Sequence, residues 1–319
     1  MECSFTSSSG KTCGAETDGK PYCYWHSDDD IKTEPDLVSL LEERARSGRP
    51  MRYFKLRNTN LENIDLVNRG QHRGYQLVHA DLYRANLQHA HLFALDLSFS
   101  SLMKADLTGA NLHSANLEYT NLLGVKLDHA KLEGVEWGDM VRQEWQGDNE
   151  PDPKKQKQLY SEAEEIYRVI GRVMRNQGIT SKIGWFLYRE LVVRRKQLPK
   201  PSLKRFVSWL VDGYCGYGEK PLRIIVSSLA LVTVFALLYS GIGLQHDGAI
   251  QNMTNTTGLP DRVKLFINSL YFSVVTFTTL GYGDFSPVGW ARPVAAIEAV
   301  IGSFTNALFV VVFVRRMTR

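Results

Sequence analysis

Residues 76–117 read QLVHADLYRANLQHAHLFALDLSFSSLMKADLTGANLHSANL, with a leucine at every fifth position. The register continues through Leu132 and ends at Trp137. Small residues, mostly alanine, stand two positions before the leucines, and aspartate or asparagine stands one position before most of them. A period of five fits neither a helix nor a strand, so the repeat indicates one side of a four-sided coil.

The repeat resembles the pentapeptide-repeat family, whose pattern is A-(D/N)-L-x-x. Over residues 51–137 the resemblance implies a right-handed quadrilateral β-solenoid, with Leu and Ala inside and Asp or Asn bonding the corner turns. Leu56, Leu61 and Leu66 continue the pattern upstream, but a one-residue slip between Gly70 and Gly74 breaks its phase. Coils of this kind bury their apolar side chains only by stacking on one another.

Two apolar runs, residues 222–244 and 293–314, follow the polar part of the chain, and each holds a single charged residue. At about 1.5 Å per residue, either run spans a hydrocarbon core of about 30 Å as a helix. Buried helices of a soluble protein are the alternative, but two such lengths in one chain of 319 residues favour membrane helices.

Basic residues gather at the outer flanks of both runs: Lys200, Lys204, Arg205, Lys220, Arg223, Arg315, Arg316 and Arg319. The positive-inside bias predicts a multi-pass protein of the cell membrane with both termini in the cytoplasm. Residues 154–205 carry 14 Lys or Arg against 4 Asp or Glu, which favours anionic lipid partners. No nucleic-acid partner is expected, because no fold signature for one is present.

The loop between the apolar runs contains TTLGYGD, residues 278–284. This resembles the potassium-channel signature, which is most often T-V-G-Y-G-D, and the resemblance covers residues 219–319. It implies an all-α two-helix pore that assembles as a homotetramer and conducts K⁺. Carbonyl rings from four chains replace the hydration shell of the ion. Glycine allows the backbone conformations that aim these carbonyls at one axis.

The resemblance assigns roles to named residues. The Thr279 hydroxyl and carbonyl would ring the ions, together with the carbonyls of Leu280, Gly281 and Tyr282, and Gly283 and Asp284 would complete the filter with Asp284 at the outer mouth. Support would come from a pore helix that begins near Val263 and closes with Val275 to Thr278, and from Tyr271 and Phe272 in an aromatic cuff with Tyr282.

Two positions depart from the usual pattern. Leu280 replaces valine behind the filter, so conductance is expected to differ more than selectivity. Val275 stands where some relatives place a glutamate that pairs with the filter aspartate, so Asp284 is expected to lack that partner.

Gly302 lies about twenty residues beyond the filter, where related channels keep a hinge glycine; packing of a small residue against a neighbour is the alternative. Phe304, Asn306 and Phe309 follow as candidates to line the cavity or the gate. Glu298 is a carboxylate within the second run, and such a group needs a partner or water. We interpret it as a packing or cavity residue.

Four potential metal ligands lie near the N-terminus, spaced C-x9-C-x9-C-x2-H: Cys3, Cys13, Cys23 and His26. Three thiolates and one imidazole suit a closed tetrahedral Zn²⁺ site. Residues 1–30 have almost no apolar core, so a metal would be needed to order them. Unligated cysteines on a disordered tail are the alternative.

The sequence thus predicts a multidomain chain. It consists of a zinc-binding-like segment (1–30), a short helix and linker (31–50), the solenoid (51–137), a linker (138–155), a basic helical hairpin (156–198), an interfacial helix (199–218) and the pore (219–319). A plain linker is the alternative for the interfacial helix, and helices of a larger bundle are the alternative for the hairpin. Within residues 35–45 the short helix is amphipathic.

We expect a potassium-selective channel that an unknown cytoplasmic ligand gates through the N-terminal domains, because only five residues follow Val314. The alternatives are a nonselective monovalent cation channel and a membrane-anchored interaction scaffold. Acidic DNA mimicry is disfavoured, since residues 51–137 hold nine basic and nine acidic residues. The histidines of this segment (72, 79, 89, 91, 113 and 129) are interpreted as surface residues, with pH sensing as the alternative. No catalytic arrangement is found, so an enzyme is not expected.

Overall fold

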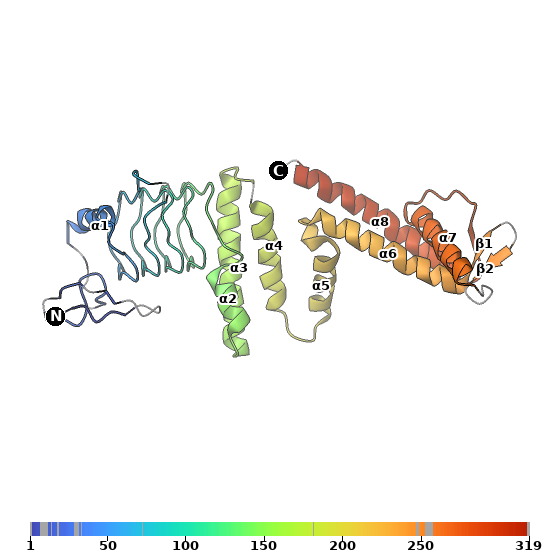
Figure 1. The fold of residues 1–319 in the computed structure, drawn as a ribbon, viewed down its shortest axis with the longest axis horizontal. Helices are drawn as coiled ribbons and strands as arrows, with labels where there is room; N and C mark the ends of the chain where they lie inside the picture. The colour runs from blue at the N-terminus through green and yellow to red at the C-terminus, as the bar shows by residue number, and fades with distance from the viewer. Residues whose placement is uncertain are drawn as a thin grey trace. The chain divides into compact units, whose positions relative to one another are not determined.

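The computed structural model describes residues 2–6, 12–13, 15–17, 19–28, 32, 34–71, 73–180, 182–246, 249–252 and 258–317. His72 and Arg319 lie outside these residues. The chain forms two compact units, Met1–Lys200 and Pro201–Arg319 (Figure 1).

The first unit is built on a solenoid whose successive coils are joined by parallel β-bridges (Figure 1). Bridges from Gln76↔Asp96 to Asn116↔Glu136 join residues that are 20 apart, so each coil contains four pentapeptides and has four sides. Upstream the separation is 26, as in Lys55↔Asp81. The first coil therefore carries six extra residues, one more than a full repeat, and this explains the slip of phase near Gly70.

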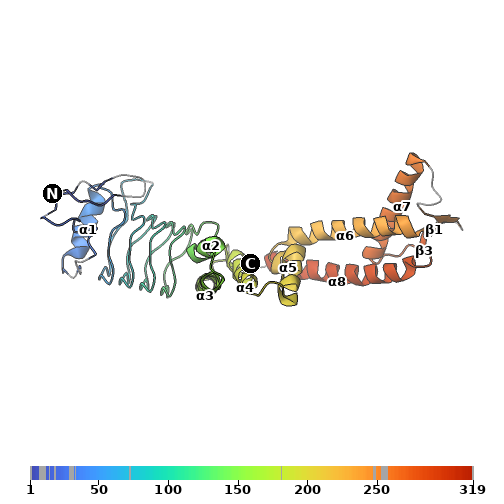
Figure 2. The same cartoon turned by 90° about the horizontal axis from the view of Figure 1, so that it is seen from below.

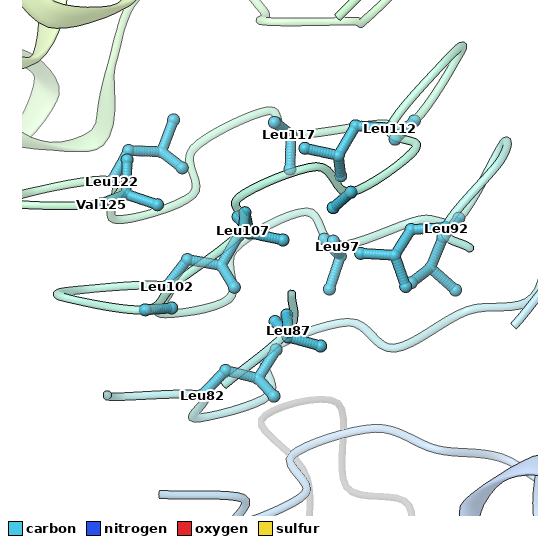
Figure 3. Close-up of a cluster of buried hydrophobic side chains, with 14 of the residues drawn as sticks. Leu82, Leu87, Leu92, Leu97, Leu102, Leu107, Leu112, Leu117, Leu122 and Val125 are labelled. Atoms are coloured by element: carbon cyan, nitrogen blue, oxygen red, sulfur yellow. The ribbon is translucent and has the colours of Figure 1, made fainter. Parts of the chain in front are cut away.

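The leucines of successive coils point into the solenoid and are buried (Figure 3). At the corners, the Asp or Asn oxygen accepts the N–H of the residue two positions on, as from Thr108 to Asp106 at 3.1 Å. The second residue after each leucine has a positive φ, for example 59° at Lys104. The expectation that Leu and Ala fill the interior and that Asp or Asn bonds the corner turns is confirmed.

One corner of the coils carries a stack of aromatic rings. His79 lies between Tyr53, at a centroid distance of 4.5 Å, and Phe99, at 5.1 Å, and Tyr119 continues the stack at 5.3 Å from Phe99. His79 is therefore a partly buried surface residue whose ring packs between those of neighbouring coils, because positions 20 residues apart meet on consecutive coils.

Helix α1 (Leu37–Arg46) covers the first coils. It lies within two residues of the predicted short helix, and its buried face is formed by Leu37, Leu41 and Ala45. A Glu42 carboxylate oxygen accepts the N–H of Asp65 at 2.9 Å, which ties the helix to the coil. Helix α1 therefore shields apolar side chains that would otherwise be exposed at this end of the solenoid.

The far end of the solenoid packs against three helices: α2 (Arg142–Asn149), α3 (Pro153–Asn176) and α4 (Ile183–Lys196). The ring of Trp137 meets that of Phe186 edge-on at 5.3 Å. Helices α3 and α4 form the predicted antiparallel hairpin, since Gln197 and Arg194 both contact Glu164.

Residues 138–155 are not the linker that their proline and aspartate content predicted, because they contain α2. Glu144 of α2 is fully buried and binds three side chains: Tyr167 at 2.7 Å, Arg189 at 2.8 Å and Lys196 at 2.9 Å. These long-range partners order a short helix that local sequence does not favour.

The second unit consists mainly of helices: α5 (Leu203–Cys215), a 3₁₀ turn η1 (Gly216–Gly218), α6 (Pro221–Ile242), α7 (Leu259–Phe277) and α8 (Ala291–Met317). Both views show α6 and α8 side by side, with α7 against them (Figures 1 and 2). By length and hydropathy, Pro221–Ile242 and Ala291–Arg315 are long and apolar enough to cross a membrane.

A small antiparallel sheet closes one end of this helical group. Its strands are β1 (Leu244–His246), β2 (Ala249–Gln251) and β3 (Ser286–Pro287), in the order β2-β1-β3. The sequence did not predict these strands, which are two or three residues long. The sheet joins the end of α6 to the segment that follows TTLGYGD.

Candidate functional site

Residues 278–284 leave the C-terminal end of α7 and lead to β3. Their first residues are tied to the last turn of α7, because the N–H of Thr279 donates to the Thr276 carbonyl and that of Leu280 to the Val275 carbonyl, both at 3.0 Å. The pore helix predicted from about Val263 to Thr278 corresponds to α7.

The backbone of this segment alternates in handedness. Thr279, Gly281 and Gly283 have φ values of 59°, 58° and 82°, whereas Leu280 and Tyr282 between them lie outside the left-handed region. In a regular β-strand, successive residues face opposite sides. Alternation between positive and negative φ instead turns successive carbonyl oxygens towards the same side. Such a row of oxygens can coordinate a cation that has lost its water.

All seven residues from Thr278 to Asp284 are exposed in the single chain. Two of them are large apolar or aromatic residues, Leu280 at 60% and Tyr282 at 68% exposure, while Phe277 immediately before them is only 4% exposed. Exposed apolar side chains on an anchored backbone are typical of a surface that another chain covers.

Asp284 lies beside α7 and β1. The His246 ring nitrogen Nδ1 lies 3.1 Å from the Asp284 carbonyl oxygen, and the Tyr271 side chain lies near the Asp284 carboxylate. Val275, which occupies the position of the absent glutamate, is buried. The described neighbours of Asp284 therefore come from Tyr271 and His246 rather than from the position of Val275.

The aromatic cuff is arranged differently within one chain. Phe272 meets Tyr239 of α6 edge-on at 4.9 Å, and Tyr271 lies 5.9 Å from the ring of Phe285. Both residues thus brace α7 against the rest of the unit, while Tyr282 extends away.

Glu298 of α8 is fully buried and joins three helices. Its carboxylate accepts a hydrogen bond from the Tyr239 hydroxyl of α6 at 2.6 Å and another from the Ser273 hydroxyl of α7. The sequence identified Glu298 as a packing or cavity residue but could not name these partners. Two hydroxyl donors satisfy a buried carboxylate that would otherwise be costly at this depth.

Gly302 lies where α8 approaches the last turn of α7. A Cβ atom there would stand 2.0 Å from the Phe277 carbonyl oxygen, so any side chain would force the helices apart. Helix α8 continues without a break through this position. Of the other proposed gate residues, Phe304 and Asn306 are exposed and Phe309 stacks on Phe313 at 5.7 Å.

Helix α5 contacts the start of α6 and the end of α8. Its Tyr214 hydroxyl hydrogen-bonds Thr305, and Asp212 pairs with Arg223. Most of its apolar side chains are nevertheless exposed: Leu203, Phe206, Val207, Trp209, Leu210 and Val211. An apolar face of this kind suits a helix that lies at a membrane surface.

The four N-terminal ligand candidates come together in space. One ligand atom from each of Cys3, Cys13, Cys23 and His26 lies within 4.8 Å of the others. Cys13 Sγ is 3.8 Å from Cys23 Sγ, and His26 Nδ1 is 3.2 Å from Cys23 Sγ and 3.7 Å from Cys3 Sγ. With Zn–S bonds of about 2.3 Å, the edges of a tetrahedral site are about 3.8 Å long. The cluster therefore has the dimensions of a site for one metal ion.

The other side of His26 is fixed by the solenoid. Its Nε2–H donates to the Arg52 carbonyl at 3.0 Å, which leaves Nδ1 facing the thiols, and its ring stacks on Phe5 at 4.0 Å. Burial lowers the pKa of His26, and the Arg52 carbonyl opposes this effect. The ring is thus neutral near pH 7, the form that binds metals, and its orientation is set by a hydrogen bond outside the cluster.

Family models match two parts of the chain: "ion channel" over residues 232–319, and "pentapeptide repeats", in eight copies, over residues 76–109 and 105–136. Two curated relatives are both named protein LctB. The one from Bacillus caldotenax is 35% identical over 83 residues, which are 26% of this chain and 60% of that protein. The one from Geobacillus stearothermophilus is 34% identical over 77 residues, 24% of this chain and 56% of that protein.

The chain therefore spans about three fifths of the length of these relatives. Solved structures of pentapeptide repeat proteins are also similar. The protein alr5209 from Nostoc PCC 7120 is 32% identical, with 32% of this chain and 95% of that chain covered and a TM-score of 0.28. HetL from Nostoc sp. strain PCC 7120 is 37% identical, with 27% of this chain and 37% of that chain covered and a TM-score of 0.25.

Proposed function

We propose that this chain, which joins pentapeptide repeats to an ion channel domain, is the subunit of a homotetrameric potassium channel of the cell membrane. The alternation of φ between residues 279 and 283 carries this proposal, because it turns the backbone carbonyls of TTLGYGD to one side. One chain supplies a single row of oxygens. Four copies around an axis would supply rings that replace the hydration shell of K⁺.

The proposed filter uses backbone groups almost entirely. The carbonyls of Thr279, Leu280, Gly281 and Tyr282, and the Thr279 hydroxyl, face the ions. Gly283 turns the chain outward, and Asp284, with Tyr271 near it, lies at the mouth. Val275 to Thr278, at the last turn of α7, support the proposed filter. The C-terminal end of this helix carries a partial negative charge, which would face a cation in the pore.

We propose that the gate lies along α8. Phe304 and Asn306 face a shared cavity in the tetramer, with Phe309 below them, and Gly302 is either a hinge or a close-packing position. The close approach of Gly302 to Phe277 favours packing in the present conformation.

Both termini are proposed to be cytoplasmic, since the basic flanks of α6 and α8 follow the positive-inside bias. Helix α5 then lies at the inner membrane surface, with its exposed apolar face towards anionic lipid. A cytoplasmic ligand would act on the N-terminal domains, whose solenoid is proposed to be the right-handed quadrilateral form.

The Cys3His cluster is proposed to bind a structural Zn²⁺ ion. Cys3, Cys13, Cys23 and His26 would hold it in a closed site, and the metal would supply cross-links rather than reactivity, because all four positions are taken by protein ligands. The match between the ligand separations and a tetrahedron supports this assignment.

Ion flux into liposomes tests the channel proposal. Purified protein should admit K⁺ and exclude Na⁺. Gly281→Ala should abolish this selectivity or the flux itself, since alanine is disfavoured at a φ of 58°. Gly241→Ala is the matched control, because a Cβ in that part of α6 would meet nothing within 4 Å. Equal Na⁺ and K⁺ flux would indicate a nonselective cation channel, and no flux would favour a membrane-anchored scaffold.

A further inference from the structure

A cavity of about 650 Å³ lies at the start of the solenoid, next to the Cys3His cluster. Its walls come from α1, from the segment that leads to the first coil, and from the six-residue insertion of that coil. Arg44, Arg49 and Arg73 represent these parts, and Cys13 and His26 form part of the rim. The volume is in the range of small-molecule binding sites.

The lining of this cavity is unusually basic. Its described residues include five arginines and no aspartate, glutamate or lysine. Arg46 pairs with Glu42 at 2.6 Å. Within the described part of the chain, the other four make no ion pair with a carboxylate: Arg44, Arg49, Arg52 and Arg73. Like charges held together without counter-charges are unfavourable, so the cavity is suited to an anion.

The hydrogen-bond donors of Arg44 are only partly paired within the protein. Its Nη2 donates to the Pro50 carbonyl at 3.2 Å, but its Nε is buried and has no hydrogen-bond partner. Burial and then the proximity of Arg49 lower the pKa of Arg44, although arginine remains charged. Arg49, Arg52 and Arg73 are exposed, so their guanidinium groups are the ones that a bound anion would engage.

The metal cluster does not account for the whole charge. One Zn²⁺ ion with three thiolates carries a net charge of −1, which a single arginine would balance. Three of the four unpaired arginines therefore still lack a counter-charge. The preference for arginine over lysine also points to planar, bidentate recognition, as in phosphate binding.

Aromatic rings complete the walls. Tyr53 and Tyr75 both line the cavity, and Phe5 contacts Tyr53 at 5.1 Å on the side near His26. Tyr53 is also the first ring of the aromatic stack on the solenoid. A ligand with a flat apolar group next to its charges would find partners for both.

We propose that this cavity binds a small molecule that carries two or more phosphate groups. The arginines bind the phosphates, and the tyrosines contact the organic group that carries them. The binding itself does not depend on the pore, so its failure and that of the channel proposal are separate outcomes.

The test is calorimetric titration of the full-length protein in phosphatidylcholine nanodiscs, with sodium tripolyphosphate and with ATP as probes. We expect binding that weakens with added salt. Arg49→Gln and Arg73→Gln should each weaken it about tenfold, because each removes a charge-assisted contact. Arg69→Gln is the matched control, since Arg69 is 74% exposed, pairs with Asp65 and lies outside the lining.

Further arms identify the source of the phosphate. Tighter binding of ATP than of tripolyphosphate, with none of adenosine, indicates a nucleotide. Weaker apparent binding of tripolyphosphate in nanodiscs that contain phosphatidylinositol bisphosphate indicates a lipid headgroup. The proposal is overturned if neither probe binds at millimolar concentration, or if Arg69→Gln weakens binding as much as the cavity variants. The zinc content of each variant, measured in parallel, shows that the neighbouring cluster is intact.

Discussion

At the scale of the residue, Thr279 is held in a conformation that its side chain disfavours. A β-branched residue with a φ of 59° is strained, by about 1–3 kcal/mol. Hydrogen bonds on both sides hold it: its N–H to Thr276 at 3.0 Å and its hydroxyl to the Thr278 carbonyl at 2.7 Å. Strain of this size is tolerated where it places a functional group, and in the proposed filter that group is the Thr279 carbonyl.

Gly302 offers a prediction that separates a packing role from a hinge. Gly302→Ala would place a methyl group 2.0 Å from the Phe277 carbonyl, so we expect a loss of stability of about 1–3 kcal/mol. The thermal unfolding midpoint of the protein in detergent measures this, with Gly241→Ala as the control. A hinge role alone would change flux and leave the midpoint where it was.

Glu298 carries the second prediction at this scale. Glu298→Ala leaves the Tyr239 hydroxyl buried without its acceptor, at about 1–3 kcal/mol, whereas the Ser273 hydroxyl can still donate to the Val232 carbonyl at 3.0 Å. Glu298→Gln keeps an acceptor oxygen and should be milder. Thermal midpoints of the two variants compare these losses. Equal losses would show that an amide oxygen does not replace the carboxylate as acceptor, and would contradict this account.

The sequence singled out these residues but did not predict all of their contacts. It identified TTLGYGD as the site because seven residues in order between two apolar runs form a specific pattern. It missed the approach of His246 to the Asp284 carbonyl, since a contact with a backbone group leaves no motif. Only the fold shows which side chains Glu298 meets, because its partners are 25 and 59 residues away.

At the scale of the element, the corner residues of the solenoid are not equivalent. Asp106 accepts hydrogen bonds from Thr108 and Gln88 and pairs with Lys126 at 2.9 Å. Burial alone would raise the pKa of Asp106, but these bonds outweigh it and lower the pKa to about 2. Asp96 also accepts the N–H two residues on, from Ser98 at 3.0 Å.

Stability should therefore depend on pH through Asp106. A carboxyl whose pKa is lowered by folding stabilises the fold fully above its unfolded pKa, near pH 4, and this contribution is lost as pH falls towards 2. Asp106→Asn should cost about 1 kcal/mol at pH 7, or about 2–4 °C in the midpoint, and less at pH 3. Asp96→Asn is the matched control. A loss that is the same at both pH values would contradict this account.

The helices show what local pattern can and cannot predict. The predicted hairpin of residues 156–198 lies within three residues of the outer ends of α3 and α4. Helix α2 was missed because its eight residues include few apolar ones, and its order comes from Glu144 binding residues 23 to 52 positions away. The strands β1 to β3 are too short to leave a period at all.

At the scale of the whole molecule, the N-terminal segment is tied to the solenoid rather than being a loose tail. The Trp25 carbonyl accepts the N–H of Lys55 at 2.8 Å, and the Trp25 ring stacks on Phe54 at 4.8 Å. The metal cluster, through His26 and Arg52, joins the same coil. The sequence predicted the ligand set but not this docking, which depends on backbone groups.

Metal removal should therefore loosen the start of the solenoid. We expect one zinc per chain by elemental analysis, and a strong chelator should lower the thermal midpoint and shift Trp25 fluorescence to longer wavelength as its ring leaves Phe54. Cys23→Ala should reproduce both changes. Cys215→Ser is the control, because Cys215 lies in the other compact unit, and it should retain the metal. Full zinc content in Cys23→Ala would contradict the assigned ligand set.

The division into two compact units agrees with the change in composition along the chain, from a polar repeat to apolar runs. Composition predicts this division because the solenoid buries its leucines and presents polar residues to water, whereas helices with exposed apolar faces are suited to lipid. For the proposed assembly of four copies, one chain offers only a weak sign, the exposed side chains of Leu280 and Tyr282.

The central claim is that carbonyl oxygens of residues 279–282 select K⁺ over Na⁺. The most direct measurement is the reversal potential of the reconstituted channel in a planar bilayer, with KCl on one side and NaCl on the other. We expect a shift of about 59 mV for each tenfold preference for K⁺, and therefore well over 59 mV for the wild-type protein. A reversal potential near zero would show that the two ions pass equally and would contradict the claim.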